Sequence, residues 1–318
     1  MFEAKRLVFM YCVSPVHMGA GTAIGPIDNP IQRERHTDYP VFAGSGLKGA
    51  IRHHLKQRWG DNGLVARIFG PEAGASSEHA GAISFTDAQL VAFPVRSLDR
   101  AFVYATSPVA LGRLKRLALL AGLEPEWEVP SIEQGHCRMA KPDSPGNTSS
   151  KLVLEAFECS ILPNGGLAAI SSWIADHALP GGQPYQFFRE KLKTDLVLLA
   201  DEEFSYFVRN ATVVEPHVRI DDETGTAESG GLFYTENLPP ESLLVALAMA
   251  SVERYKKDKP NGWMDAETVM EQVAKGDNDR LGLTEQLLQI GGDSTTGRGL
   301  VVVRFPETNN EVGHDRHA

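Results

Sequence analysis

The sequence predicts an α+β fold, on the strength of three observations. An early strand is followed by a glycine-rich loop and a helix, and the second half of the chain repeats this order loosely. A second glycine-rich stretch, residues 291–299, then leads into a final strand at 300–305. Interleaved strands and helices of this kind are typical of α+β proteins. With 318 residues, 42% of them apolar, the chain can bury one large core or two modest ones.

The first third of the chain holds the most informative elements. Residues 7–13 are rich in β-branched, aromatic and apolar side chains and precede a Ser-Pro pair, which indicates a strand and its end. A long loop with His17 and Asp28 follows, and a loop of this length inside a compact domain is usually functional or mobile. A helix is expected over 46–59, because Leu47, Ile51 and Leu55 recur at every fourth position.

The other elements are predicted from periodicity and turn residues. Up to residue 212 we expect one or two strands in a hairpin over 81–96, a helix over 107–122, a surface loop over 133–150, a strand over 151–162, helices over 167–178 and 184–192, and a strand over 204–209. After it we expect a projecting hairpin with arms 213–220 and 231–234, an apolar strand or helix over 243–251, a charged loop over 256–261, helices over 265–275 and 281–290, the strand over 300–305 and a frayed tail.

Composition narrows the classes of function. A net charge of −10 argues against a protein that coats nucleic acid indiscriminately, because such binding depends on summed positive charge. Three widely spaced cysteines form neither a disulfide framework nor a zinc pattern, which favours packing residues in a reducing compartment. No apolar run is long enough for a membrane span, so we expect a cytoplasmic protein without membrane contact.

The predicted first helix is unusually basic. Residues 39–60 contain no acid and four cations, Lys48, Arg52, Lys56 and Arg58. The helix follows a Gly-Ser-Gly turn centred on Ser45, so backbone N–H groups, the positive end of the helix dipole and Lys48 could meet one phosphate. The alternative is a solvated helix face. The neighbouring histidines lack the spacing of helical metal ligands, so a metal site is not expected there.

Five motifs occur in a fixed order along nearly the whole chain. They are residues 14–21 (SPVHMGAG), 28–34 (DNPIQRE), 44–49 (GSGLKG) and 233–241 (FYTENLPPE), and the closing stretch with Gly291-Gly292 and Gly297-Arg298-Gly299. Together they resemble the RAMP superfamily and, within it, the fourth Cmr protein, the repeated backbone subunit of type III-B CRISPR (Cmr) complexes. Five ordered motifs are far more specific than any one of them.

The resemblance implies a ferredoxin-like (RRM-related) palm with a β-hairpin thumb and a helical insertion, in a single domain over 1–318. The implied palm comprises 1–122, 151–162, 204–212 and 238–306, with a loop at 133–150, the insertion at 167–200, the thumb at 213–236 and a tail at 307–318. It also implies a subunit that stacks with further copies of itself along a crRNA guide, beside other Cmr subunits, and cleaves complementary target RNA at six-nucleotide intervals with a divalent metal, Mg²⁺ or Mn²⁺.

The resemblance also assigns roles to residues. Asp28 matches the loop aspartate most closely tied to cleavage, while His17 and Glu236 match residues linked to RNA binding or cleavage. From the residues themselves, Asp28 could equally be a turn former, His17 a loop histidine and Glu236 an ordinary surface acid. Arg298 lies in a glycine-rich loop that resembles a phosphate cradle but lacks the Lys-Ser/Thr of a nucleotide-hydrolysing P-loop. We count it with Ser45, Lys48, Arg52 and Lys56 as expected RNA-binding residues.

The chemistry of RNA agrees with these roles. The 2′-hydroxyl of RNA can attack the adjacent phosphorus, so a protein can accelerate cleavage largely by imposing an in-line geometry. Asp28 could serve as general base or hold a magnesium ion, and the sequence leaves both open. Two other functions remain: a structural subunit that binds and spaces the guide without cutting, and a processing enzyme that matures the guide precursor.

Overall fold

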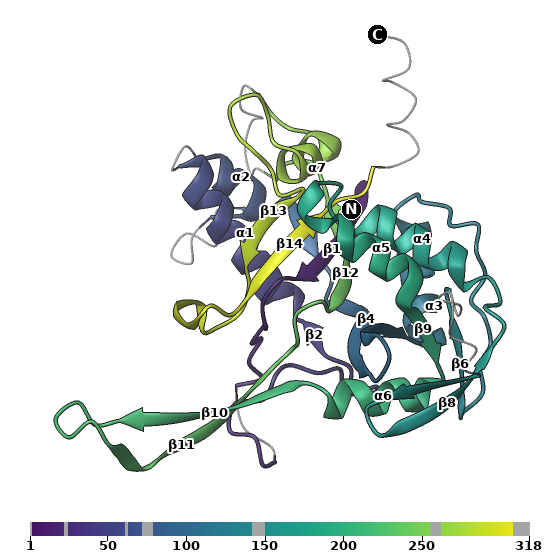
Figure 1. The fold of residues 1–318 in the computed structure, drawn as a ribbon. Coiled ribbons are helices and arrows are strands. Elements are labelled where there is room, and N and C mark those ends of the chain that lie inside the picture. The colour runs from purple at the N-terminus through teal and green to yellow at the C-terminus, as the bar shows by residue number, and fades with distance from the viewer. Residues whose placement is uncertain are drawn as a thin grey trace.

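A computed structural model describes residues 2–21, 25–60, 63–71, 79–141, 150–254 and 262–307. It is a mixed α+β fold with seven α-helices and a large sheet among these residues (Figure 1). The strands are β1 (Ala4–Cys12), β2 (Val41–Phe42), β3 (Ile83–Phe85), β4 (Ala88–Ser97), β5 (Ala101–Thr106), β6 (His136–Met139), β7 (Lys151–Leu154), β8 (Phe157–Leu162), β9 (Leu196–Leu199), β10 (Val213–Ile220), β11 (Ala227–Asn237), β12 (Leu243–Ala250), β13 (Gln286–Gln289) and β14 (Leu300–Arg304). The helices are α1 (Gly44–Trp59), α2 (Leu64–Phe69), α3 (Pro108–Leu120), α4 (Leu167–Ala178), α5 (Gln186–Asp195), α6 (Asp201–Asn210) and α7 (Ala266–Ala274).

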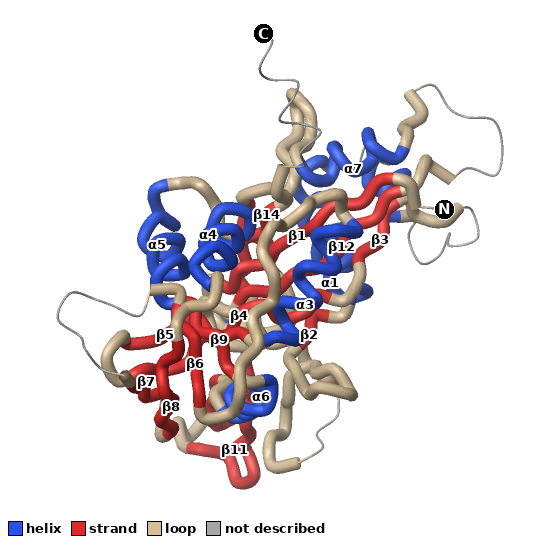
Figure 2. The backbone as a smooth tube through the Cα atoms, turned by 90° about the vertical axis from the view of Figure 1, so that its right-hand side faces the viewer, coloured by secondary structure: helices blue, strands red, loops and turns tan. Residues whose placement is uncertain are grey.

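Twelve strands form the main sheet, in the order β13-β14-β1-β12-β4-β5-β9-β6-β8-β7, with β2 beside β4 and β3 beside β12. They cross the middle of the molecule as one band (Figure 2). Strand β1 lies inside the band, antiparallel to both β12 and β14. Because its side chains alternate between the two faces, Val8 and Met10 enter one apolar core and Leu7 and Phe9 the other.

Helices bury an apolar stripe against each face of the sheet. The larger core contains residues of α1, α2, α6 and α7, and the smaller one contains residues of α3, α4 and α5. In α1 the predicted stripe of Leu47, Ile51 and Leu55 is fully buried. None of the helices in the described part of the chain is both long and apolar enough to cross a membrane.

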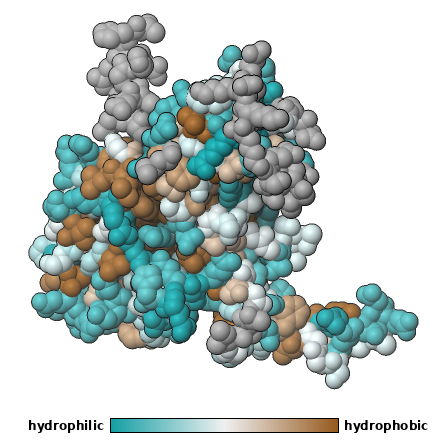
Figure 3. All heavy atoms as spheres, turned by 180° about the vertical axis from the view of Figure 1, so that it is seen from behind, coloured by the Kyte–Doolittle hydropathy of each residue, from teal (hydrophilic) through white to brown (hydrophobic). Residues whose placement is uncertain are grey.

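Strands β10 and β11 form a separate antiparallel hairpin. It projects away from the body of the molecule (Figure 1), and seen from behind it is apolar near its base and hydrophilic at its tip (Figure 3). Val218 and Leu232 face each other on one side of it and are about half exposed. Since an isolated two-stranded hairpin is marginal in water, the contacts at its base determine where it points.

Many predicted elements are confirmed within a few residues. They include β1, α1, α3 with Ser107 as its N-cap, α4, α5, the β10–β11 hairpin, α7 and β14. The ambiguous apolar run over 243–251 is the strand β12, and the segment 151–162 is a hairpin of two strands, β7 and β8. The predicted charged loop over 256–261 and the tail beyond residue 307 lie outside the described residues.

Four expectations are wrong. Residues 204–209, expected as a strand, belong to helix α6, and residues 281–290, expected as a helix, contain strand β13. The described part of the loop expected over 133–150 contains strand β6, which pairs with β8 and β9, and residues 142–149 lie outside the described residues. Strands β3 and β4 do not form a hairpin with each other, because both pair with β12. The segment 167–200, expected as a helical insertion, contains α4, α5 and strand β9, and its assignment as an insertion stays a prediction.

Candidate functional site

Asp28 lies against the base of the β10–β11 hairpin. Its side chain is exposed, and its Oδ2 accepts a hydrogen bond from the backbone N–H of Tyr234 at 2.7 Å. The next residue, Asn29, forms a parallel bridge with Thr235, so the loop adds a short third segment to the hairpin. Two backbone bonds close this segment: Asn29 N–H to Tyr234 O at 3.0 Å and Glu236 N–H to Asn29 O at 2.9 Å. The carboxylate is thus held in place by backbone groups and still meets solvent.

Glu236 holds the same loop from inside. Its side chain is buried, with Oε1 accepting from Arg33 Nη2 at 2.6 Å and from the Thr212 hydroxyl at 2.8 Å. Its Oε2 accepts from the backbone N–H of Ile31 at 3.1 Å. A buried carboxylate needs donors of this kind, because each unpaired charge would carry a large desolvation cost. The Glu236 carboxylate therefore clamps the 28–33 loop to the hairpin, an arrangement that suits a positioning residue.

His17 is attached to the same backbone. Its Nδ1 lies 2.7 Å from the carbonyl oxygen of Glu236. A carbonyl can only accept, so Nδ1 must carry the proton, and in the neutral ring Nε2 is then left as a proton acceptor. Nε2 faces Gly19, where an added Cβ would lie 3.0 Å away. The glycine therefore leaves the acceptor nitrogen uncovered on that side.

The backbone of His17 packs closely against Gly291 and Gly292. Gly291 has φ +81°, and a Cβ at this position would clash with the carbonyl oxygen of His17. The backbone N–H of Gly292 donates to that same oxygen at 2.9 Å. The second glycine-rich stretch thus packs backbone on backbone against the His17 loop, an approach that a side chain would prevent.

The three predicted catalytic residues are therefore brought together, although more than 200 positions separate Asp28 from Glu236. Asp28 binds the N–H of Tyr234, Glu236 accepts from Ile31, and His17 binds the carbonyl of Glu236. The arrangement offers one exposed carboxylate and one imidazole acceptor nitrogen beside a projecting hairpin. Either group can accept a proton from a hydroxyl group.

Arg298 lies in the second glycine-rich stretch and meets the other face of the hairpin base. Its Nη2 donates to both carboxylate oxygens of Glu215 on β10, at 2.7 and 2.6 Å. Both side chains are about one-quarter exposed. The expected RNA-binding role of Arg298 stays a prediction, and the ion pair gives this residue a second role, which is to anchor the hairpin.

The predicted basic face of α1 has two distinct parts. Ser45 and Lys56 are exposed, whereas Lys48 and Arg52 are half-buried, with Arg52 donating to the carbonyl oxygen of Pro71 at 3.1 Å. Burial, together with the nearby Arg52 and Arg254 guanidinium groups, lowers the pKa of Lys48. A bound anion would favour the charged form of Lys48 and so oppose both effects.

The N-terminus of α1 differs from the prediction. The first backbone N–H, of Gly44, donates to Asp87 Oδ1 at 2.7 Å, so an acid from the turn between β3 and β4 already occupies this donor. Asp87 lies 43 positions away from Gly44 in the chain, so no pattern around the helix indicates it. An anion at α1 would be met by the side chains of the basic face more than by the helix end.

A divalent metal would find one exposed carboxylate at the hairpin base, that of Asp28. The described residues hold no group of three or more His, Cys, Asp or Glu side chains that could bind a metal ion. Mg²⁺ is often bound through one or two carboxylates, waters and the phosphates of the substrate. The residues present therefore fit an ion shared with RNA phosphates, with Asp28 as the protein ligand, rather than a site built by protein groups alone.

Sequence reasoning missed two residues of the site. Arg33 neutralises Glu236 and also donates to the carbonyl oxygens of Asp38 and Val208, and Thr212 donates to Glu236 from the start of the hairpin. Arg33 falls within one of the quoted motifs, but neither its charge nor its spacing indicates a buried partner 203 residues away.

Comparisons with known proteins agree along nearly the whole chain. The family described as the RAMP superfamily matches residues 9–302. The CRISPR system Cmr endoribonuclease Cmr4 of Pyrococcus furiosus is 35% identical over 309 residues, which cover 96% of this chain and 97% of that protein. The CRISPR system CMR subunit Cmr4 of Saccharolobus solfataricus is 25% identical and covers 93% and 95%. The crystal structure of oligomeric Cmr4 from Pyrococcus furiosus superposes with a TM-score of 0.71 at 28% identity, covering 96% and 99%.

Proposed function

The chain belongs to the RAMP superfamily, and from that premise we propose that it is the guide-RNA-binding backbone subunit of a type III-B CRISPR complex and cleaves complementary target RNA. The relative from Pyrococcus furiosus is named an endoribonuclease, and its structure is described as oligomeric. The observation that carries the proposal is the convergence of Asp28, His17 and Glu236 at the base of the hairpin. Other copies of the chain and other Cmr subunits are the proposed protein partners.

In this proposal the sheet and its helices form a ferredoxin-like palm, and the β10–β11 hairpin acts as the thumb. The hairpin stands clear of the palm, so it can enter a guide–target duplex and interrupt its stacking at regular intervals. Specificity then comes from base pairing with the guide, while the protein reads backbone and shape. The cations of α1 would hold the guide phosphates, since this helix has a basic face on an otherwise acidic chain.

Cleavage would use the 2′-hydroxyl of the target as the nucleophile. Its oxygen would bond to the adjacent phosphorus, and the bond from that phosphorus to the 5′-oxygen of the next nucleotide would break, leaving a 2′,3′-cyclic phosphate and a 5′-hydroxyl that takes up a proton. Asp28, exposed and fixed by the N–H of Tyr234, is the proposed general base that removes the hydroxyl proton. His17 would offer Nε2 as a second proton acceptor next to the 2′-hydroxyl. Glu236 would act through the loop it clamps rather than by touching the RNA. In the alternative role, Asp28 would hold a divalent ion together with the phosphates, and that ion would supply charge stabilisation.

Substitution of Asp28 in the assembled complex tests the assignment. Asp28→Asn keeps an oxygen that can accept the Tyr234 N–H but removes the charge, so we expect target binding to persist and fragment formation to fall at least about 100-fold. Asp222→Asn, at the exposed hairpin tip, is the matched control and should cut normally. Full-rate cutting by Asp28→Asn would show that Asp28 is not the base.

The same experiment separates the alternative, a structural subunit that spaces the guide without cutting. In that case the complex with the unaltered chain would bind the target and release no fragments at six-nucleotide spacing.

A further inference from the structure

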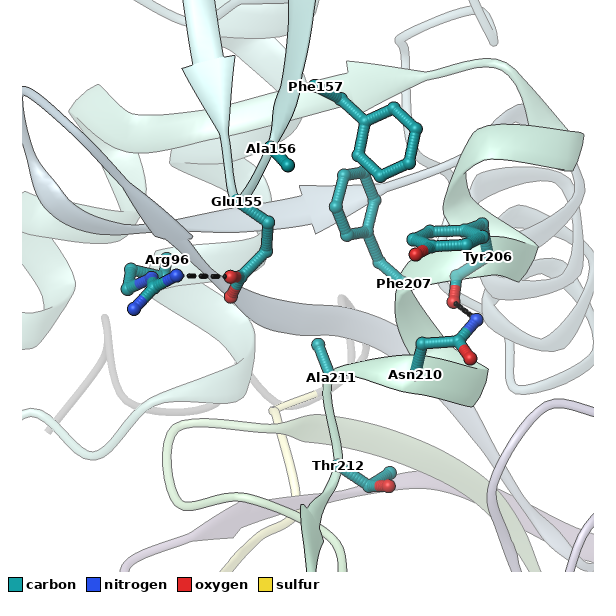
Figure 4. A pocket seen from close by; sticks show the side chains of 9 residues that line it. All are labelled: Arg96, Glu155, Ala156, Phe157, Tyr206, Phe207, Asn210, Ala211 and Thr212. Atoms are coloured by element: carbon teal, nitrogen blue, oxygen red, sulfur yellow. Dashed lines mark hydrogen bonds and ion pairs between the residues drawn. The ribbon is translucent and has the colours of Figure 1, made fainter.

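A cavity lies beside the site, and Thr212 is part of its lining. It has a volume of about 510 Å³ and lies between the end of β4, the turn from β7 to β8, and the C-terminal half of α6 (Figure 4). Cavities of this size fall within the usual range for small-molecule sites, about 300–1,000 Å³. None of the roles proposed above uses it.

One wall of the cavity is aromatic. Phe157 and Tyr206 are 44% and 46% exposed, and their rings meet edge to face with centroids 4.8 Å apart. The buried ring of Phe207 packs against both rings, and its centroid lies 5.8 Å from that of Phe157 and 5.7 Å from that of Tyr206. The exposed rings are therefore held at a fixed angle before anything binds. Two large aromatic side chains kept half exposed in this way form a preorganised stacking surface.

The opposite wall is polar but carries no net charge. Arg96 donates to Glu155 at 2.7 Å, and these two side chains are the only charged groups among the residues that line the cavity. Asn210 and Thr212 add an amide and a hydroxyl at its foot, as Figure 4 shows. A phosphate would find no unpaired cation here. A neutral, flat ring with donors and acceptors on its edge would find both stacking partners and polar ones.

Thr212 connects the cavity to the catalytic candidates. It lines the cavity, and its hydroxyl donates to Glu236 Oε1, the carboxylate that clamps the Asp28 loop. Thr212 therefore links the cavity to the Glu236 carboxylate at the hairpin base.

We propose that this cavity binds an unpaired base of RNA, stacked on Phe157 and Tyr206 and hydrogen-bonded along its edge to the polar wall. The inference rests on the proposed function, because it assumes that RNA reaches the hairpin base. Unpaired bases are recognised in proteins by this combination of aromatic stacking and edge contacts. The cavity would hold one nucleotide in place beside the bond to be cut.

The test compares two RNAs of equal length on the full-length chain. One is single-stranded RNA with normal bases, and the other carries abasic ribose at every position, so that only phosphate contacts remain. Tyr206→Ala and Phe157→Ala should each weaken binding of the normal RNA by about 5- to 150-fold and leave binding of the abasic RNA unchanged. The salt dependence should not change, because no phosphate contact is lost.

Two control variants keep the result interpretable. Tyr206→Trp retains a stacking surface and should restore most of the affinity. Phe187→Ala removes an aromatic side chain on α5 that is even more exposed, at 69%, and should have no effect. Thermal unfolding of each variant shows that the protein is folded.

The outcomes separate this inference from the proposed function. If the alanine variants bind normal RNA as tightly as the unaltered chain, which still cuts its target within the complex, the base-binding inference is wrong and the proposed function stands. Equal losses for both RNAs would also overturn it. A loss of self-association in the alanine variants, with RNA binding unchanged, would overturn the inference as well, because the cavity would then bind a protein partner. If the unaltered chain binds normal RNA no more tightly than abasic RNA, no base contact contributes to binding and the inference is wrong.

Discussion

Replacing Glu236 with alanine should lower the free energy of unfolding by about 3–5 kcal/mol. The substitution leaves the Arg33 guanidinium, only 17% exposed, without its anion, and it removes the acceptor of the Thr212 hydroxyl and the Ile31 N–H. Each lost hydrogen bond would cost about 1–3 kcal/mol alone, but groups that share one carboxylate do not contribute additively. The loss of the ion pair between Glu236 and Arg33 therefore determines the size of the expected change in the free energy of unfolding.

Urea denaturation monitored by circular dichroism measures this change as a lower midpoint. Glu228→Ala is the matched control on the same strand, because Glu228 pairs with Arg219 at 3.4 Å and both side chains are well exposed. Such a surface pair should contribute less than about 1 kcal/mol. Equal midpoints for Glu236→Ala and the control would refute the clamp. Asp28→Ala should lose cleavage with almost no change in midpoint, which distinguishes a reacting group from a positioning one.

Three further predictions concern RNA contacts, loop packing and pH. Replacing both Lys48 and Arg52 with alanine should weaken RNA binding equally for every RNA sequence. The slope of binding affinity against salt concentration should fall by the amount expected for about two phosphate contacts, and a loss of affinity that depends on RNA sequence would contradict these contacts. Gly291→Ala should lower the melting temperature more than Gly297→Ala, because both have positive φ but only Gly291 faces a backbone carbonyl; equal shifts would exclude the close approach. Burial raises the pKa of Glu241 to about 7. The folded protein therefore favours the protonated carboxyl group, and its free energy of unfolding falls as pH rises from about 4.5 through 7. Glu241→Gln should therefore unfold at a higher temperature than the unaltered chain at pH 8 and lose this advantage near pH 4.5.

The fold could be predicted where local pattern and tertiary packing agree. The spacing of Leu47, Ile51 and Leu55 predicts α1 because the same residues contact the sheet. The same kind of prediction is wrong for residues 204–209, because their short apolar run is also typical of a strand. In the structure Phe204 and Phe207 lie on one buried helix face, and Asp201 begins a first turn with three acids, a favourable helix start.

The other wrong expectations have a common cause in long-range pairing. Strand β6 looks polar in sequence, but Cys137 and Met139 alternate inward once β8 and β9 flank it. Strand β13 is short and lies at the edge of the sheet, where only its pairing with β14 defines it. Between β3 and β4, Asp87 leaves the sheet to bind the first N–H of α1. No pattern within one segment contains these partners.

The site divides in the same way. Asp28, His17 and Glu236 could be selected through motifs, and the structure brings all three to one place. Arg33 and Thr212 could not be selected, because their significance depends on a buried carboxylate that is distant in sequence. The motifs therefore locate the residues of the site, and the buried ion pair that orders them is visible only once the chain is folded.

The hairpin base explains why these groups stay together. Asp28 is held by the backbone N–H of Tyr234 and His17 by the backbone carbonyl of Glu236, so their positions depend on the path of β11. That path is anchored on one side by Glu236 with Arg33 and on the other by Arg298 with Glu215 on the paired strand. Two ion pairs at the base of a hairpin that is marginal alone can thus fix the geometry of a site while its distal half remains exposed for other contacts.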